Sequence, residues 1–317
     1  MTTLQTITTD SAAIIKTFIR TSTAQKVASE LTDNLLQYAK GKHNYIVIDE
    51  KNQTIYFIDN GTGFNEKSFQ KAHNLFGSPI ESSGISRYSI GSKIFGAVAN
   101  VREIYSINRF GQCFSSCWDL NTGPDKFSTL SENSAKELSE LMAKYEFDHG
   151  TIIALKQVHW GKEFRTASAF FKSIKNYFDS RYQHYLYKNN TSLTILMKMN
   201  NGEVQSHKVS SKDILKSAKS DLPRNHVTSD GEIIEYQSFY SPESRGISNQ
   251  GIEIYYDDIK IDTIDWKRFT SRNGFTNRAK HNSLNHCRQL VFLNSVNSKG
   301  VTIDQNKASC DLPEEIY

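Results

Sequence analysis

Apolar residues recur every three or four positions over residues 23–40, which predicts an amphipathic helix. The residues of this apolar stripe are Ala24, Val27, Ala28, Leu31, Leu35 and Tyr38. A hydroxyl side chain within residues 21–23 is expected to cap the start of the helix, and Gly41 is expected to end it. Similar spacing predicts further helices over residues 12–19, 131–145, 160–187 and 210–219.

Runs rich in β-branched and aromatic residues predict strands separated by turns. In the first half of the chain the runs cover residues 43–49, 53–58, 101–108, 112–120 and 150–158. In the second half they cover residues 193–199, 232–238, 252–256, 260–264 and 289–292. We expect a first α+β sandwich over residues 1–158, with one sheet and its helices on one face, and a second α+β domain over residues 159–317. The boundary is expected within residues 159–190.

The first predicted helix carries two polar residues with catalytic potential. Glu30 and Asn34 are four positions apart, so they project from one face of the helix. A carboxylate in that position can orient and deprotonate a water molecule, and an amide oxygen can complete the shell of a Mg²⁺ ion held mostly by phosphates. The alternative is that both residues are solvated on an ordinary helix, as charged residues usually are.

A glycine-rich turn follows the second predicted strand. Asp59 ends that strand, and Gly61 and Gly63 follow it. A carboxylate held at such a turn can accept a hydrogen bond from the exocyclic amine of a nucleobase, and glycines let the backbone approach a ligand closely. The alternative is an Asn-Gly hairpin turn. The next apolar residues have helical spacing, which argues against a partner strand at this point.

A loop of small residues over positions 82–91 precedes an apolar segment that begins near Lys93. Such a loop can present backbone N–H groups and the positive end of a helix dipole to an anion, and a lysine can add a point charge. No Walker A string occurs. The alternative is a flexible surface loop before a core helix.

In this order, the motifs resemble those of the GHKL ATPases. This superfamily includes type II topoisomerase subunits such as gyrase, the mismatch-repair protein MutL, ninety-kilodalton heat-shock chaperones, histidine kinases and, most similar here, MORC proteins. The E-x-x-x-N motif matches Glu30 and Asn34, the D-x-G-x-G motif matches Asp59, Gly61 and Gly63, the last glycine of the lid matches Gly91, and a Gly-Thr motif matches Gly150 and Thr151. The resemblance implies a Bergerat fold that binds ATP and Mg²⁺.

The resemblance also implies roles for these residues. Glu30 is the expected general base, and Asn34 the Mg²⁺ ligand. Asp59 is expected to contact the adenine amine, with Thr151 beside it. The lid would wrap the triphosphate with backbone from Ser86, Ser89 and Gly91, and Lys93 resembles the lid lysine of MORC-type members. Ser86 and Ser89 stand where the family often has glycine, which predicts a stiffer or differently shaped lid.

The second half of the chain resembles the transducer domain of the same superfamily. In that domain a loop lysine reaches back to the γ-phosphate. The string Asp304-Gln305-Asn306-Lys307 resembles this loop, so Lys307 is the candidate catalytic lysine that stabilises charge during phosphoryl transfer. The alternative is a solvated lysine.

Residues 266–303 contain no Asp or Glu. The basic residues of this stretch that form a candidate nucleic-acid patch are Lys267, Arg268, Arg272, Arg278, Lys280 and Arg288. Such a stretch can track a phosphate backbone, although a solvated loop or a protein-docking face is an equal alternative. The formal net charge is only +4, so the patch would be local.

Composition places the chain among globular proteins, with 38% hydrophobic and 23% charged residues. No signal peptide or membrane span is indicated, which predicts a soluble cytoplasmic protein without a membrane partner. The four cysteines lack zinc-ligand spacing.

Two hypotheses follow. The first is an ATPase that forms an ATP-dependent homodimer and acts as a clamp or switch, with DNA or RNA as a candidate partner. The second is a nucleotide-binding module that does not hydrolyse ATP and recruits a separate effector protein. Glu30 favours the first, because binding alone needs no base.

Overall fold

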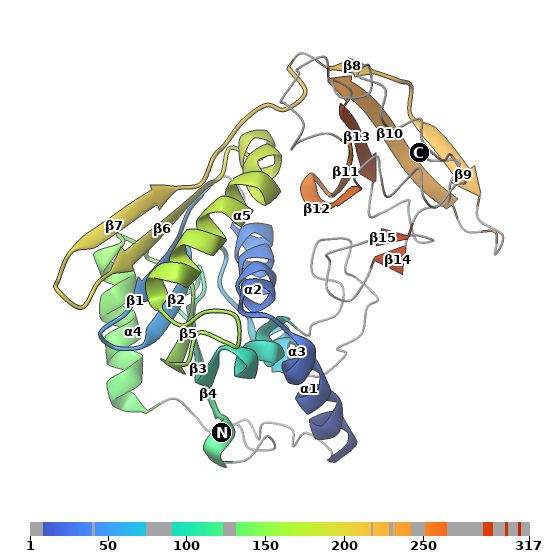
Figure 1. Cartoon of the computed structure of the whole chain (residues 1–317). Helices are drawn as coiled ribbons and strands as arrows, with labels where there is room; N and C mark the ends of the chain where they lie inside the picture. The colour runs from blue at the N-terminus through green and yellow to red at the C-terminus, as the bar shows by residue number, and fades with distance from the viewer. Residues whose placement is uncertain are drawn as a thin grey trace. The chain divides into compact units, whose positions relative to one another are not determined.

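The chain has a mixed α+β fold with two large sheets (Figure 1). The computed structural model describes residues 9–39, 42–73, 91–122, 131–216, 218–227, 231, 233–241, 251–264, 288–293, 302–303 and 310–311. These residues divide into two compact units. The first unit holds the described residues up to 179 together with 189–209, and the second holds residues 180–188 and the described residues from 210 onward.

The first unit is built on a seven-stranded sheet with the strand order β4-β3-β5-β2-β1-β6-β7. Its strands are β1 (His43–Asp49), β2 (Thr54–Asp59), β3 (Ala99–Ile107), β4 (Cys113–Asp119), β5 (Gly150–Val158), β6 (Ser192–Lys198) and β7 (Val204–Lys208). All neighbours are antiparallel except β1 and β6, which pair in parallel. The expectation that β5 is the last strand of the first domain is therefore wrong, because β6 and β7 extend the same sheet.

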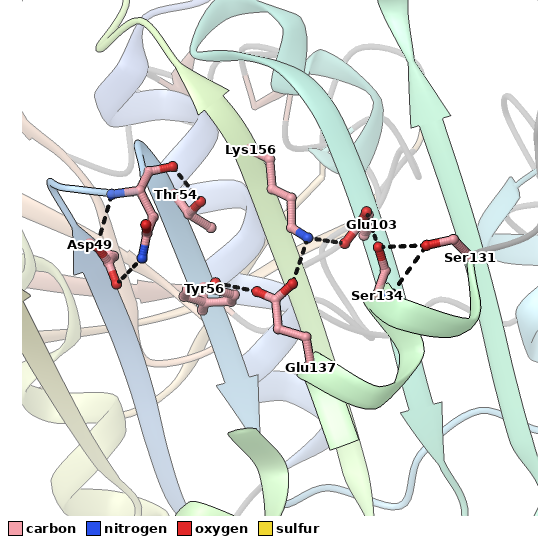
Figure 2. A network of polar contacts seen from close by, with 9 residues as sticks. Asp49, Thr54, Tyr56, Glu103, Ser131, Ser134, Glu137 and Lys156 are labelled. Carbon is pink, nitrogen blue, oxygen red and sulfur yellow. Dashed lines mark hydrogen bonds and ion pairs between the residues drawn. The ribbon is translucent and has the colours of Figure 1, made fainter. Parts of the chain in front are cut away.

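Helices cover both faces of this sheet, whereas the sequence led us to expect helices on one face. Helix α4 (Glu132–Lys144) covers one face of the sheet. Its buried residues Leu138 and Met142 pack in a cluster with Tyr56 and Ile58, which point to that face from β2. Helix α2 (Ala24–Tyr38) lies behind the sheet in the view of Figure 2, where α4 is in front. The remaining helical segments of the described first unit are α1 (Thr9–Thr21), α3 (Glu66–His73), η2 (Gly91–Ala97) and η3 (Leu120–Thr122), and α5 (Ala167–Lys188) is shared with the second unit.

A polar network ties α4 to the sheet (Figure 2). The Lys156 ammonium lies 2.8 Å from a carboxylate oxygen of Glu103 and donates to Glu137 on α4 at 3.0 Å. The Tyr56 hydroxyl donates to Glu137 at 2.8 Å, and the Ser134 hydroxyl donates to Glu103 at 3.1 Å. Burial opposes ionisation of Glu137, but the hydrogen bonds from Lys156 and Tyr56 hold its pKa below the usual range.

Replacing the central cation of this network should destabilise the protein. Lys156→Met is expected to lower the free energy of unfolding by about 1–3 kcal/mol, because it leaves the buried Glu103 carboxylate without its cation. Lys136→Met is the matched control, since Lys136 and its partner Glu140 are 78% and 69% exposed; its expected effect is below about 0.5 kcal/mol. Urea denaturation measures both. Equal effects of the two variants would contradict the structural role of the network.

The pH dependence of stability should change in the same variant. The lowered pKa of Glu137 contributes stability above its unfolded-state pKa, and this contribution is lost as the pH falls through the folded-state value. The midpoint of urea unfolding should therefore depend less on pH in the acidic range for Lys156→Met than for the unmodified chain.

The second unit is built on a six-stranded sheet of order β12-β11-β13-β10-β8, with β9 also paired to β10. Its strands are β8 (Lys219–Ser220), β9 (Arg224–Val227), β10 (Ile233–Ser241), β11 (Gly251–Tyr256), β12 (Ile259–Ile264) and β13 (Arg288–Leu293). Residues along β11 alternate between two clusters: Ile252 and Ile254 lie in one core, and Tyr255 in another. A short ladder joins β14 (Thr302–Ile303) and β15 (Cys310–Asp311).

The predicted helix over residues 210–219 is absent from the described part of this segment, which forms a turn and then β8. The Asp213 carboxylate accepts a hydrogen bond from the Leu215 backbone N–H at 2.9 Å, and this local bond competes with helix formation. None of the helices described is long and apolar enough to cross a lipid bilayer.

Candidate functional site

Helix α2 presents the first pair of candidate residues. Its start is capped as predicted, since the Thr23 hydroxyl accepts a hydrogen bond from the Lys26 backbone N–H at 3.1 Å. Glu30 is only 8% exposed, and Asn34 is half-buried one turn further along. The alternative of a solvated pair therefore does not describe Glu30. A buried carboxylate is costly unless it is paired or hydrogen-bonded, and Glu30 has an interaction of this kind within the chain.

Asp59 lies at the end of β2, directly opposite Thr151 in the register of β2 and β5. Its Oδ1 atom accepts hydrogen bonds from the backbone N–H groups of Gly61, at 2.8 Å, and Thr151, at 3.2 Å. No donor to Oδ2 is found among the described residues. Burial raises the pKa of Asp59 to about 7, and the two backbone hydrogen bonds oppose this rise. The side chain therefore has one oxygen bound to the protein and one available to a ligand.

Glycine is required at three places around Asp59. A Cβ at Gly61 would lie 2.7 Å from the Tyr38 carbonyl oxygen, so the end of α2 packs directly on this turn. Gly63 has φ +66, and a Cβ there would lie 2.3 Å from the Ile107 carbonyl oxygen. Gly150 has φ +137, and its Cβ would lie 2.0 Å from the Asp59 carbonyl oxygen. Helix α3 follows the turn, so the hairpin alternative is wrong.

Ser106 also belongs to the site, although it lies in none of the sequence motifs. It lies opposite Thr151 in the register of β3 and β5 and is fully buried. Its hydroxyl accepts from the Phe64 backbone N–H at 2.9 Å and lies 3.0 Å from the Gly150 carbonyl oxygen and 3.1 Å from the Thr151 hydroxyl. Ser106 therefore joins the glycine-rich turn to β5. No sequence signal marks it, because only the strand register brings it to the site.

Lys93 lies in the interior of the first unit. It is 1% exposed and follows Gly91, the first residue of η2. Burial, and then the nearby charge of Arg102, lower the pKa of Lys93 to about 7. The Arg102 guanidinium lies 5.7 Å from the ring centre of Phe95 and 5.3 Å from that of Trp118. The segment after the lid position is therefore a short 3₁₀ helix anchored on a buried cationic and aromatic cluster.

Several predicted residues lie outside the described residues. These are Ser86 and Ser89 of the lid, the loop lysine Lys307, and the patch residues Lys267, Arg268, Arg272, Arg278 and Lys280. Arg288 is described, and it differs from the expectation: it is buried and pairs with Glu253. Arg288 therefore supplies an internal ion pair and no surface charge to the patch.

The site offers little to a metal ion on its own. No group of three or more His, Cys, Asp or Glu side chains that could hold a metal occurs in the part of the chain that the structure describes. The half-buried amide of Asn34 fits a Mg²⁺ ion whose other ligands are phosphates and waters.

The sequence matches no protein-family model and no curated protein. Among solved structures, the fold is similar to a crystal structure described as the N-terminal domain of a DNA repair protein. The TM-score is 0.52 at 12% sequence identity, and the match covers 91% of this chain and 88% of that chain. At this identity the similarity shows a shared fold, so the α+β fold of this chain recurs in the N-terminal domain of a DNA repair protein.

Proposed function

We propose that the first unit is a GHKL-type (Bergerat) nucleotide-binding domain that binds Mg²⁺ and ATP and hydrolyses ATP slowly. The observation that carries this proposal is the convergence on Asp59 of the glycine-rich turn, the end of α2 and the start of β5. The order of the motifs in the sequence supports the same function. The similarity in fold to the N-terminal domain of a DNA repair protein favours a process linked to DNA.

Each residue then has a defined task. The Oδ2 atom of Asp59 accepts a hydrogen bond from the exocyclic amine of adenine, and Thr151 lies beside Asp59. Gly61 and Gly63 let the turn pack against the Tyr38 and Ile107 carbonyl groups, and this packing would hold the turn beside the nucleotide. Glu30, on helix α2, orients and deprotonates the attacking water. Asn34 would hold a Mg²⁺ ion, and the ion would neutralise phosphate charge.

The nucleotide is proposed to drive a change in assembly. ATP binding would close the chain into a homodimer, which acts as a clamp or switch. The second unit would serve as the transducer, with Lys307 as the residue that senses the terminal phosphate. Glu30 favours turnover over a module that only binds ATP, because binding alone would not need a general base beside the Mg²⁺ ligand.

A substitution at Glu30 tests turnover separately from binding. Glu30→Gln is expected to lower the rate of ATP hydrolysis at least ~100-fold, because the general base is lost, while the dissociation constant of ATP stays within about threefold. The matched control is Glu140→Gln on α4, whose side chain is 69% exposed and which should leave the rate unchanged. Steady-state phosphate release measures the rates. Tight ATP binding without Glu30-dependent turnover would contradict the hydrolase proposal and leave the regulatory module.

Assembly is measured in the same samples. The mass in solution is expected to double when a non-hydrolysable ATP analogue and Mg²⁺ are added. An unchanged mass with saturating analogue would contradict the clamp.

A further inference from the structure

A cavity of about 380 Å³ lies within the second unit. It is formed by the last residues of α5, the exposed side of β10, and the turn between β11 and β12. The lining residues that matter here are His184, Lys188, Glu235, Phe239, Asp258 and Phe292. The volume falls in the range of cavities that bind small molecules or single side chains of a partner.

The charge of this cavity is negative, although the chain as a whole is positive. Glu235, Asp257 and Asp258 line it with three carboxylates, and Lys188 is its one cation among the described lining residues. His184 is 4% exposed, and burial lowers its pKa, so it is neutral near pH 7. The lining therefore carries more negative than positive formal charge, which favours a cationic ligand. Glu235 and Asp257 each have further interactions within the chain, so Asp258 is the carboxylate that the cationic ligand would bind.

The cation already present can be displaced. The Lys188 ammonium lies 2.9 Å from Asp258 Oδ1, but its side chain is 60% exposed. An exposed ion pair of this kind contributes little to stability, so its exchange for another cation costs little. The His184 Nε2 atom lies 3.8 Å from the same oxygen, and its Nδ1 atom has no hydrogen-bond partner among the described residues.

Aromatic rings form one wall of the cavity. The rings of Phe239 and Phe292 meet edge to face with centres 5.4 Å apart. Neighbouring rings hold Phe292 in place. Its ring centre lies 4.6 Å from that of Tyr255, on which it stacks, and 5.1 Å from that of His184. Rigid rings beside carboxylates form a site that suits a flat cation, and guanidinium stacks on aromatic faces better than ammonium does.

An exposed apolar pair lies beyond the cavity, on the face of β10 that carries the lining residues Glu235, Gln237 and Phe239. Ile233, Glu235, Gln237 and Phe239 alternate along the strand and therefore share one face. Ile233 is 51% exposed and lies opposite Val227 on β9, which is 61% exposed. This pair lies roughly 13 Å along the strand from the middle of the cavity, or about four residues of an extended peptide.

We propose that this cavity binds an arginine side chain from an extended segment of a partner protein, with an apolar side chain of that segment on Val227 and Ile233. The guanidinium displaces Lys188 from Asp258 and stacks against the Phe239 and Phe292 wall. Nucleic acid does not fit the site, because its phosphates would face net negative charge. The interaction is independent of nucleotide binding in the first unit.

The probe for this proposal is N-acetyl-arginine methylamide, titrated into the full chain with ¹³C-labelled phenylalanine and histidine. We expect saturable NMR shifts of Phe239, Phe292 and His184 at millimolar probe, in the absence of nucleotide. Asp258→Asn should weaken binding at least fivefold, and asparagine tolerates the backbone conformation of Asp258, which has φ +68. Glu203→Gln, an exposed carboxylate in the first unit, should not change it.

The outcomes separate the alternatives. Equal weakening by Asp258→Asn and Glu203→Gln would reduce the effect to nonspecific charge attraction and overturn the proposal. Equal shifts with N-acetyl-glutamate methylamide would show an anion site and also overturn it, as would the absence of saturation. A peptide with leucine four residues from the arginine should bind more tightly than the single amino acid, and Ile233→Ser should remove that gain.

Discussion

Asp59→Asn is expected to weaken ATP binding at least ~100-fold and, at the same time, to raise the thermal stability of the nucleotide-free chain. The Oδ1 atom of Asp59 accepts two backbone N–H groups, so the amide oxygen of an asparagine must take the same position. Its NH₂ group then replaces Oδ2 and faces the adenine amine. The asparagine NH₂ group and the adenine amine are both hydrogen-bond donors, so the adenine amine would lose its acceptor.

The gain in stability follows from the raised pKa of Asp59. Burial raises its pKa to about 7 in the folded chain, well above the ordinary value that an aspartate has in an unfolded chain. Between these values the folded state holds a proton that the unfolded state has released, so stability falls as the pH rises toward 7 and the full penalty remains above it. Asparagine carries no charge and removes that penalty, of the order of a few kcal/mol. The variant should therefore gain more stability at pH 8 than at pH 5.

Calorimetric titration with ATP and thermal melts at the two pH values measure both effects. Asp119→Asn, another aspartate at the end of a strand, is the matched control and should change neither. Unchanged ATP affinity in Asp59→Asn would contradict the assignment of the adenine contact. Lower stability of the variant at pH 8 would contradict a buried carboxylate with a raised pKa. A gain in stability at a functional residue is the expected trade-off between stability and activity.

The second large effect is expected at Gly150. A Cβ at this position would lie 2.0 Å from the Asp59 carbonyl oxygen, and φ +137 is strained for any L side chain. Gly150→Ala must therefore move β5 away from the end of β2, which displaces the Thr151 N–H from Asp59. We expect a loss of about 3 kcal/mol in the free energy of unfolding and loss of ATP binding in the molecules that remain folded.

Gly202→Ala separates backbone strain from the clash. Gly202 also has positive φ, at +86, but no atom lies within 4 Å of its Cβ position. Its expected cost is about 1 kcal/mol, with ATP binding unchanged. Urea denaturation and ATP titration of both variants test this. Equal costs would mean that the approach of β5 to Asp59 is not the reason for the glycine.

Local pattern predicted most elements of the first unit. The limits of β1 and β5 agree with the predicted runs, and Thr23 caps α2 as expected, because strand alternation and capping depend on neighbouring residues. The motif residues Asp59 and Thr151 are brought together, as the Gly-Thr motif implied. The strand limits and the cap depend on neighbouring residues, and the motifs are short runs of sequence.

Long-range pairing could not be predicted in the same way. Nothing in the predicted run at residues 193–199 distinguishes a strand of the first sheet from one of the second. Only the parallel pairing of β6 with β1 places this strand in the first sheet. Ser106 contacts Thr151, 45 residues later in the chain, only because the register of β3 and β5 brings the two residues together. Arg288 looks like a surface cation in the sequence, but Glu253, 35 residues earlier, makes it an internal ion pair.

The central claim is that the first unit binds ATP with Mg²⁺, and a calorimetric titration of the unmodified chain with a non-hydrolysable ATP analogue tests it most directly. We expect one nucleotide per chain, with affinity that falls at least tenfold when Mg²⁺ is removed by chelation. Absence of a binding heat and of any rise in melting temperature at millimolar analogue, with Mg²⁺ present, would contradict the claim.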